Sequence, residues 1–217
     1  MVSTTACKWD TVIPFEPLWE QYERVIKDNG AIVLTASQPF TSALVMSNPK
    51  RFKYCWVWDK VKPSGFQVAK HRPMMRQEDI CVFGKGKINY YPMMTNREKV
   101  KKSHVYGSSD SNPIKYNDKQ ERIYTKKYPQ SILEFSNANQ KEKVHPTQKP
   151  VALFEYLIRT YTNEDDTVLD NCIGSGTTAI ACLNTGRFFI GIEKDEHYYQ
   201  VATNRVQEWH DNRGLFT

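Results

Sequence analysis

The chain has 217 residues, of which 40% are hydrophobic and 25% are charged, so it has enough apolar material for one domain with its own core. No apolar run approaches the roughly 20 residues of a membrane-spanning helix, and the N-terminus lacks the charged and then apolar pattern of a signal peptide. The five cysteines are widely spaced without a Cys-x-x-Cys pair, so the sequence predicts neither a disulfide framework nor a zinc site and favours a reducing compartment.

The net charge of +6 is unevenly distributed. Residues 1–84 carry eleven Lys and Arg against eight Asp and Glu, a net of +3. Residues 85–149 carry fourteen against six, a net of +8, and residues 150–217 carry five against ten, a net of −5. Basic surface attracts the phosphate backbone of nucleic acids, although a lysine-rich loop can also serve only solubility. We therefore expect any contact with nucleic acid in the middle third.

The N-terminal part predicts one helix and three strands. Apolar residues recur at helical spacing over 15–26, and Gly30 marks the stop. A buried strand is predicted over 31–35, and two more over 53–59 and 79–84. The connection between the last two strands is too rich in Pro, Gly and charge to be a core element.

Residues 85–144 contain much Gly, Ser, Asn, Pro and Lys, and they show little periodicity. We interpret them as an inserted, basic and loop-rich region, partly mobile, within a single domain that spans residues 1–217. Such a region is typical of a variable recognition surface.

The C-terminal part predicts a helix followed by two strand–helix pairs. The helix begins at Pro150 and carries an apolar face. The strands are predicted over 168–170 and 188–193, and their helices over 177–184 and 196–210. Strands that alternate with helices in this way indicate an α/β fold with a parallel sheet.

A glycine-rich turn joins the first of these strands to its helix. The strand ends in Asp170, the turn reads GSGTT over 174–178, and the next strand ends in Glu193. Glycines let a backbone approach a ligand closely, and an acid after the second strand can hold ribose hydroxyls. The pattern indicates a nucleoside-cofactor site. Gly174, Gly176 and Ala179 also fit the dinucleotide fingerprint, so NAD remains an alternative, as does a turn needed only for packing.

Two features favour S-adenosylmethionine over NAD. Asp170 precedes the glycines, where a carboxylate suits the amino group of a methionine moiety and would repel a pyrophosphate. The unit also leaves too little chain after it for a second nucleotide-binding half.

Several motifs together resemble the amino-methyltransferases of DNA, in the permuted class whose cofactor motif follows the catalytic half. The resemblance rests on HPTQKP at 145–150, on D-x-x-x-G-S-G-T-T from Asp170, and on the runs TTACKWDTVIPFEPLWEQY and GAIVLTASQPF, which are similar to phage-borne and prophage-borne members. It extends from Thr4 to about Val206. The family usually has Pro and Phe where this chain has Asn171 and Cys172.

The resemblance implies a doubly wound, mostly parallel α/β fold of the Rossmann-like methyltransferase type. It implies transfer of a methyl group from S-adenosylmethionine to the exocyclic amine of a base flipped out of double-stranded DNA. Adenine is favoured and cytosine remains open. It also implies a cytoplasmic location in a bacterium or a phage-infected host, and it admits a homodimer. The predicted cofactor contacts are Asp170, Gly174, Ser175, Gly176, Thr177, Thr178, Glu193, Lys149, Thr147, Ser37 and Phe40.

One motif of the family is missing. Members place an Asp-(Pro/Leu)-Pro-Tyr tetrapeptide directly before the Gly-Thr-Thr that matches residues 3–5, whereas this chain begins Met-Val-Ser and contains no such run elsewhere. That tetrapeptide holds the amino group of the target base. We therefore assign no catalytic residue. We expect a truncated or misannotated start that lacks the N-terminal strand between those ending at Asp170 and near Thr35, with little methyltransferase activity. The alternative is an inactive relative that binds DNA or cofactor.

Overall fold

The computed structural model describes residues 12–103, 122–137 and 148–214. These residues form two compact units. The main unit contains the chain up to Tyr91 and from Ser131 onward, and the ribbon unit contains Pro92–Gln130. The ribbon unit has fewer residues than the predicted insertion at 85–144, because the chain already pairs with the main sheet again from residue 132.

The larger sheet of the main unit has four strands in the order β1-β3-β2-β6. They are β1 (Ile32–Ala36), β2 (Phe52–Ser64), β3 (Met75–Phe83) and β6 (Ile132–Glu134). β3 pairs antiparallel with β1 and β2, and β2 pairs parallel with β6. The sequence predicted the first three strands.

Three features of this region differ from the prediction. β2 and β3 both extend into the segment between them, which the sequence had indicated was not a core element. There they form a solvent-exposed hairpin, which needs no alternation of apolar and polar residues. β6 was missed because its three residues bury only Leu133. Helix α2 (Phe40–Ser47) was also missed, since the Ser-Gln-Pro run before it looks like a loop and the helix is only 8 residues long.

Alternate residues of β3 enter two different hydrophobic clusters. Ile80 and Val82 pack with Trp56, Trp58 and α3 (Val151–Tyr161) on one face. On the other face Cys81 and Phe83 pack with residues of α2 and of α1 (Phe15–Val25). The period of two is that of a strand covered on both faces.

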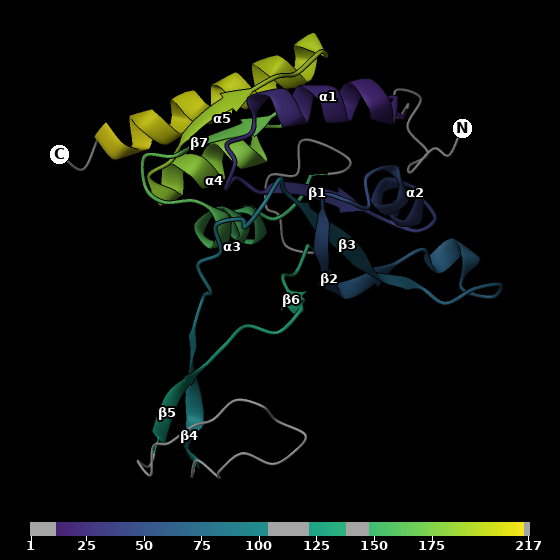
Figure 1. The fold of residues 1–217 in the computed structure, drawn as a ribbon. Coiled ribbons are helices and arrows are strands. Elements are labelled where there is room, and N and C mark those ends of the chain that lie inside the picture. The colour runs from purple at the N-terminus through teal and green to yellow at the C-terminus, as the bar shows by residue number, and fades with distance from the viewer. Residues whose placement is uncertain (1–11, 104–121, 138–147, 215–217) are drawn as a thin grey trace. The chain divides into compact units, whose positions relative to one another are not determined.

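The smaller sheet of the main unit contains only β7 (Thr167–Asp170) and β8 (Phe188–Gly191), which pair in parallel. Helices α4 (Thr177–Thr185) and α5 (Glu196–Gly214) follow them, as predicted, and α4 contacts β8 and α5. Figure 1 shows this sheet with α4 and α5, apart from β1 and β3 with α2. Among the described residues, β7 pairs only with β8 and β1 only with β3.

The two faces of the smaller sheet are very different. Val168 and Phe189 pack against a cluster formed by α3 and α4. The opposite face consists of large apolar side chains that are 42–62% exposed. We call it the open face; it contains Leu169, Phe188, Ile190 and Ile192.

Helix α1 packs on the larger sheet through Trp19, and α1 with the residues after it contacts the smaller sheet through polar side chains. The Tyr22 hydroxyl donates to Asn171 Oδ1 at 3.0 Å, just after β7. Lys27 Nζ lies 2.8 Å from Asp166 Oδ1, just before β7. The chain from Tyr22 to Lys27 therefore runs opposite to β7, with one polar contact at each end of that strand.

The ribbon unit is a pair of antiparallel strands, β4 (Thr95–Ser103) and β5 (Arg122–Lys127), which the sequence had predicted to be loops. The strands were missed because their described side chains are mostly exposed, so no face imposes apolar alternation. Within the described part of the chain, no helix is long and apolar enough to cross a membrane. The same residues contain no cluster of His, Cys, Asp or Glu suited to a metal ion.

Candidate cofactor site

The turn after β7 is organised around the carboxylate of Asp170. Its Oδ1 accepts a hydrogen bond from the backbone N–H of Cys172 at 3.0 Å. Its Oδ2 accepts a short hydrogen bond from the hydroxyl of Thr178, in the first turn of α4. The carboxylate therefore joins the strand end to the helix start, as expected for an acid that fixes a ligand-binding turn.

The two glycines of the turn have different tasks. Both adopt a left-handed backbone, with φ of +54° at Gly174 and +79° at Gly176. A Cβ at Gly176 would lie 3.0 Å from the Cβ of Ala202 in α5, so this glycine is needed for packing. The N–H of Gly174 points instead to Glu193 Oε2, at 2.8 Å. Gly174 thus joins the turn to the segment that follows β8.

Glu193 closes the site from the end of β8. Besides Gly174, its carboxylate accepts hydrogen bonds from the backbone N–H groups of Lys194 at 2.9 Å and Asp195 at 3.0 Å. An ionised carboxylate offers about four lone-pair positions. Three of them are used here, so the side chain is held in place with room to accept one further donor.

Segment 148–150 is bound to the same turn. Ser175 Oγ donates to Gln148 Oε1 at 3.2 Å, and Thr177 Oγ1 donates to the Lys149 carbonyl at 3.5 Å. The structure thereby brings Lys149 to the turn, although only its backbone makes the contact. Thr147 lies outside the described residues.

The two predicted contacts from the other sheet stay predictions. Ser37 follows β1, and its carbonyl accepts a hydrogen bond from Thr41 in α2. Phe40 stacks on Phe15 with ring centroids 5.9 Å apart and packs against the core cluster of α1 and α2. No described hydrogen bond joins either residue to the glycine turn.

Sequence reasoning missed two residues that hold the turn. Tyr22 donates to Asn171, and burial, with added repulsion from Cys172 and Asp170, raises its pKa to about 12. Tyr22 is therefore neutral and acts as a donor at ordinary pH. Arg205 of α5 donates from Nη1 to the Ser175 carbonyl. Neither residue has a local sequence signal, because each comes from a helix distant in the chain.

The structure gives Asn171 a partner of its own. In this chain, Asn171 and Cys172 stand where the related motif has Pro and Phe. The amide oxygen of Asn171 is the acceptor for Tyr22, an interaction that a proline side chain cannot make. Burial raises the pKa of the Cys172 thiol, and the neighbouring Asp170 and Glu193 raise it further. The thiol is therefore protonated at neutral pH.

Comparison with known proteins finds that the chain is similar to DNA methyltransferases. The chain is 42% identical over 81 residues to the type II methyltransferase M.HpaI of Haemophilus parainfluenzae, which is 36% of this chain and 26% of that relative. It is 44% identical over 63 residues to M2.DpnII of Streptococcus pneumoniae, covering 29% and 24%. The matched stretches thus span about a quarter of these curated relatives.

A solved structure matches over more of the chain. The crystal structure of the M1.HpyAVI–SAM complex superposes with a TM-score of 0.62 and 27% identity, over 92% of this chain and 85% of that one. The α/β methyltransferase fold expected from the sequence is confirmed. Residues 7–204 match the family model N6_N4_Mtase, described as DNA methylase. The chain therefore belongs to this DNA methylase family.

Proposed function

We propose that the glycine turn and Glu193 bind S-adenosylmethionine, and that the protein transfers a methyl group to the exocyclic amine of a base in DNA, adenine at N6 in preference to cytosine at N4. The observation that carries the proposal is the turn after β7, where Asp170 accepts hydrogen bonds from Cys172 and Thr178, and Gly174 donates to Glu193 just beyond the parallel strand β8. The similar M1.HpyAVI structure, which contains SAM, supports the choice of cofactor.

The residues of the turn fit such a cofactor. Glu193, with one acceptor position remaining, suits a hydroxyl of a ribose diol. Asp170 lies on the strand end, where its charge suits an ammonium group. When bound, S-adenosylmethionine would supply an activated methyl group. The protein would bind and orient that cofactor.

A second candidate is a protein that binds cofactor or DNA without transferring a methyl group. An assay of methyl transfer from tritiated S-adenosylmethionine to duplex DNA separates the two candidates. The homodimer and the cytoplasmic location stay predictions.

Calorimetry tests the cofactor. S-adenosylmethionine or its demethylated product is expected to bind, whereas NAD is not. Glu193→Ala is expected to lower the affinity about 10-fold to 150-fold, because a charge-assisted hydrogen bond contributes roughly 1.5–3 kcal/mol. Glu196→Ala, in the exposed first turn of α5, is the matched control and is expected to bind like the wild type.

Asp170→Ala, checked for folding by circular dichroism, should lose affinity as well. If both Glu193→Ala and Asp170→Ala bind the cofactor as tightly as the wild type, the site is assigned wrongly. Binding of NAD in place of S-adenosylmethionine would overturn the cofactor while keeping the site.

The ribbon unit is the proposed main contact with duplex DNA. Its strands carry Arg97, Lys99 and Lys101 on β4, and Lys126 and Lys127 on β5. A two-stranded antiparallel ribbon fits the width of the major groove, and the surrounding region 85–149 has a net charge of +8. Positive charge on such a ribbon favours phosphate contacts.

A salt titration of DNA binding tests this contact. Each neutralised phosphate contributes about 0.9 to the slope of log affinity against log salt. Lys99→Glu and Lys101→Glu are each expected to reduce the slope, whereas Lys50→Glu, on an exposed turn of the main unit, should leave it unchanged. Arg205 is unsuitable as a control because it supports the glycine turn. Equal effects at all three lysines would contradict a localised DNA surface on the ribbon.

A further inference from the structure

The hairpin formed by the outer parts of β2 and β3 is not used by the site or by the ribbon unit. Residues 60–76, here called the basic hairpin, contain five Lys and Arg and no Asp or Glu. From the sequence this segment had been treated as a connection. The structure makes it an ordered arm that extends the larger sheet.

The base of the basic hairpin is fixed by one carboxylate. Asp59 Oδ1 accepts hydrogen bonds from the backbone N–H of Val61 at 2.7 Å and from Arg76 Nε at 2.6 Å. Val61 has a φ of +64°, a conformation that β-branched residues rarely adopt. Such backbone strain persists only where the surrounding structure imposes it, and it is most frequent at functional sites. Lys60 is also engaged, 3.3 Å from Glu78.

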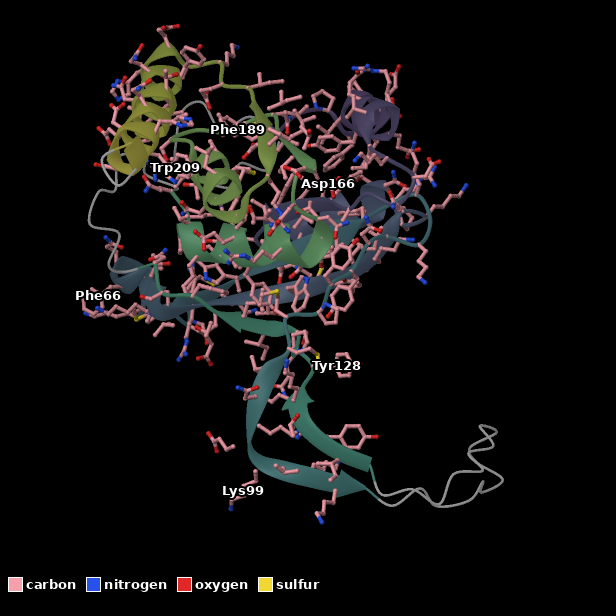
Figure 2. The ribbon with its side chains drawn as sticks, turned by 90° about the vertical axis from the view of Figure 1, so that its left-hand side faces the viewer. Phe66, Lys99, Tyr128, Asp166, Phe189 and Trp209 are labelled. Atoms are coloured by element: carbon pink, nitrogen blue, oxygen red, sulfur yellow. The ribbon has the colours of Figure 1, made fainter. Side chains whose placement is uncertain are left out.

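The basic hairpin carries one exposed aromatic ring, together with cations that form no ion pair with the described acidic residues. Gly65, with a φ of +90°, turns the chain into a short 3-10 helix that begins at Phe66. Phe66 is 80% exposed, and Figure 2 shows it at the outer end of the hairpin, away from Asp166 and Phe189. The described acidic residues form no ion pair with the exposed cations of the tip, which are Lys62, Lys70 and Arg72.

This combination points to one kind of partner. A single exposed Phe is ordinary, and so is a single exposed Lys. Three cations without a described ion pair, on the same hairpin as an exposed aromatic ring, suit a polyanion that also offers flat apolar faces. Nucleic acid has both properties, since Lys and Arg neutralise its phosphates and apolar side chains wedge between or stack on its bases.

We propose that the basic hairpin is a second DNA-contact surface, separate in sequence from the ribbon unit, in which Phe66 inserts between or stacks on bases while Lys62, Lys70 and Arg72 hold the backbone. The proposal rests on the proposed function, because membership of a DNA methylase family favours duplex DNA over other polyanions. An anionic membrane surface is the competing partner that the experiment must exclude.

The test uses the full chain and a duplex that contains 2-aminopurine, whose fluorescence rises when it is unstacked. Wild-type protein is expected to bind the duplex and raise the fluorescence. Phe66→Ala should weaken binding about 5-fold to 100-fold, as loss of a stacked base predicts, and should abolish the rise without changing the salt slope. Phe66→Tyr should restore both. Tyr199→Ala, a half-exposed aromatic on α5, is the matched control and should behave as wild type.

The charges are tested separately. Lys62→Glu with Lys70→Glu is expected to reduce the salt slope by about 1 to 2, and Lys50→Glu should not reduce it. If the wild type binds duplex and Phe66→Ala matches it in affinity and fluorescence, the basic hairpin is not a DNA contact, although the proposed function stands. If the wild type binds no duplex, the proposed function itself fails. Phe66-dependent binding to phosphatidylglycerol vesicles, with duplex binding unaffected, would overturn the proposal in favour of a membrane contact.

Discussion

The two sheets of the main unit have opposite relations to solvent. In the four-stranded sheet, β3 buries Ile80, Cys81, Val82 and Phe83 completely, because helices cover both faces. In the β7–β8 sheet one face packs on α3 and α4, and the open face leaves Phe188 62% exposed. The candidate cofactor site is built on the second, half-covered sheet.

The difference separates stability from function within one unit. The larger sheet carries most of the buried core, whereas the smaller one carries the acids and glycines that we propose to bind the cofactor. Exposed apolar side chains on neighbouring strands indicate a surface that is covered by something else, since large apolar patches are uncommon on soluble proteins. Among the described residues, β7 and β1 each have one edge without a neighbouring strand, which also indicates a surface that is covered by something else.

Truncation of one side chain in each sheet should sharpen the comparison. Trp58 is 1% exposed and donates from Nε1 to the Phe135 carbonyl at 2.8 Å. Trp58→Ala is therefore expected to cost about 3–5 kcal/mol in the free energy of unfolding. Phe188→Ala should change it by no more than about 0.5 kcal/mol. A large cost at Phe188, measured by urea unfolding at several protein concentrations, would show that the open face is covered in solution.

The smallest expected effect concerns the polar link between the sheets. The hydrogen bond from Lys27, followed by that from the backbone N–H of Asn163, holds the pKa of Asp166 below its usual value. A carboxyl whose pKa is lower in the folded state stabilises above its unfolded pKa, and this contribution disappears as the pH falls through the folded value. Because Lys27 is 71% exposed, Lys27→Met should cost only about 0.2–1 kcal/mol at pH 7.

The loss of unfolding free energy in Lys27→Met should vanish in strong acid and become smaller in high salt. Urea unfolding across pH 2–7 measures both effects. Arg24→Met, in the last turn of α1, is the matched control, because its described hydrogen bond goes to Gln21, three residues away. A cost at Lys27 that persists below pH 2 would show that its aliphatic chain, and not the ion pair, holds α1 to β7.

The sequence was sufficient for the parts of the protein that depend on local pattern. Helical spacing over 15–26, the strand that ends at Asp170 and the GSGTT turn all follow from neighbouring residues, and each appears where it was predicted. The family could be identified for the same reason, since its motifs are short and contiguous.

Only the tertiary structure decided what depends on distant partners. Tyr22 and Arg205 support the glycine turn from α1 and α5, and no residue near them in sequence predicts it. The strands β4 and β5 and the outer parts of β2 and β3 lack a buried face, so they leave no alternating pattern to detect. The open face was hidden for the opposite reason. Its apolar residues predict a buried strand face. Whether that face is buried depends on which other segment packs against it, and the strand's own sequence does not determine this.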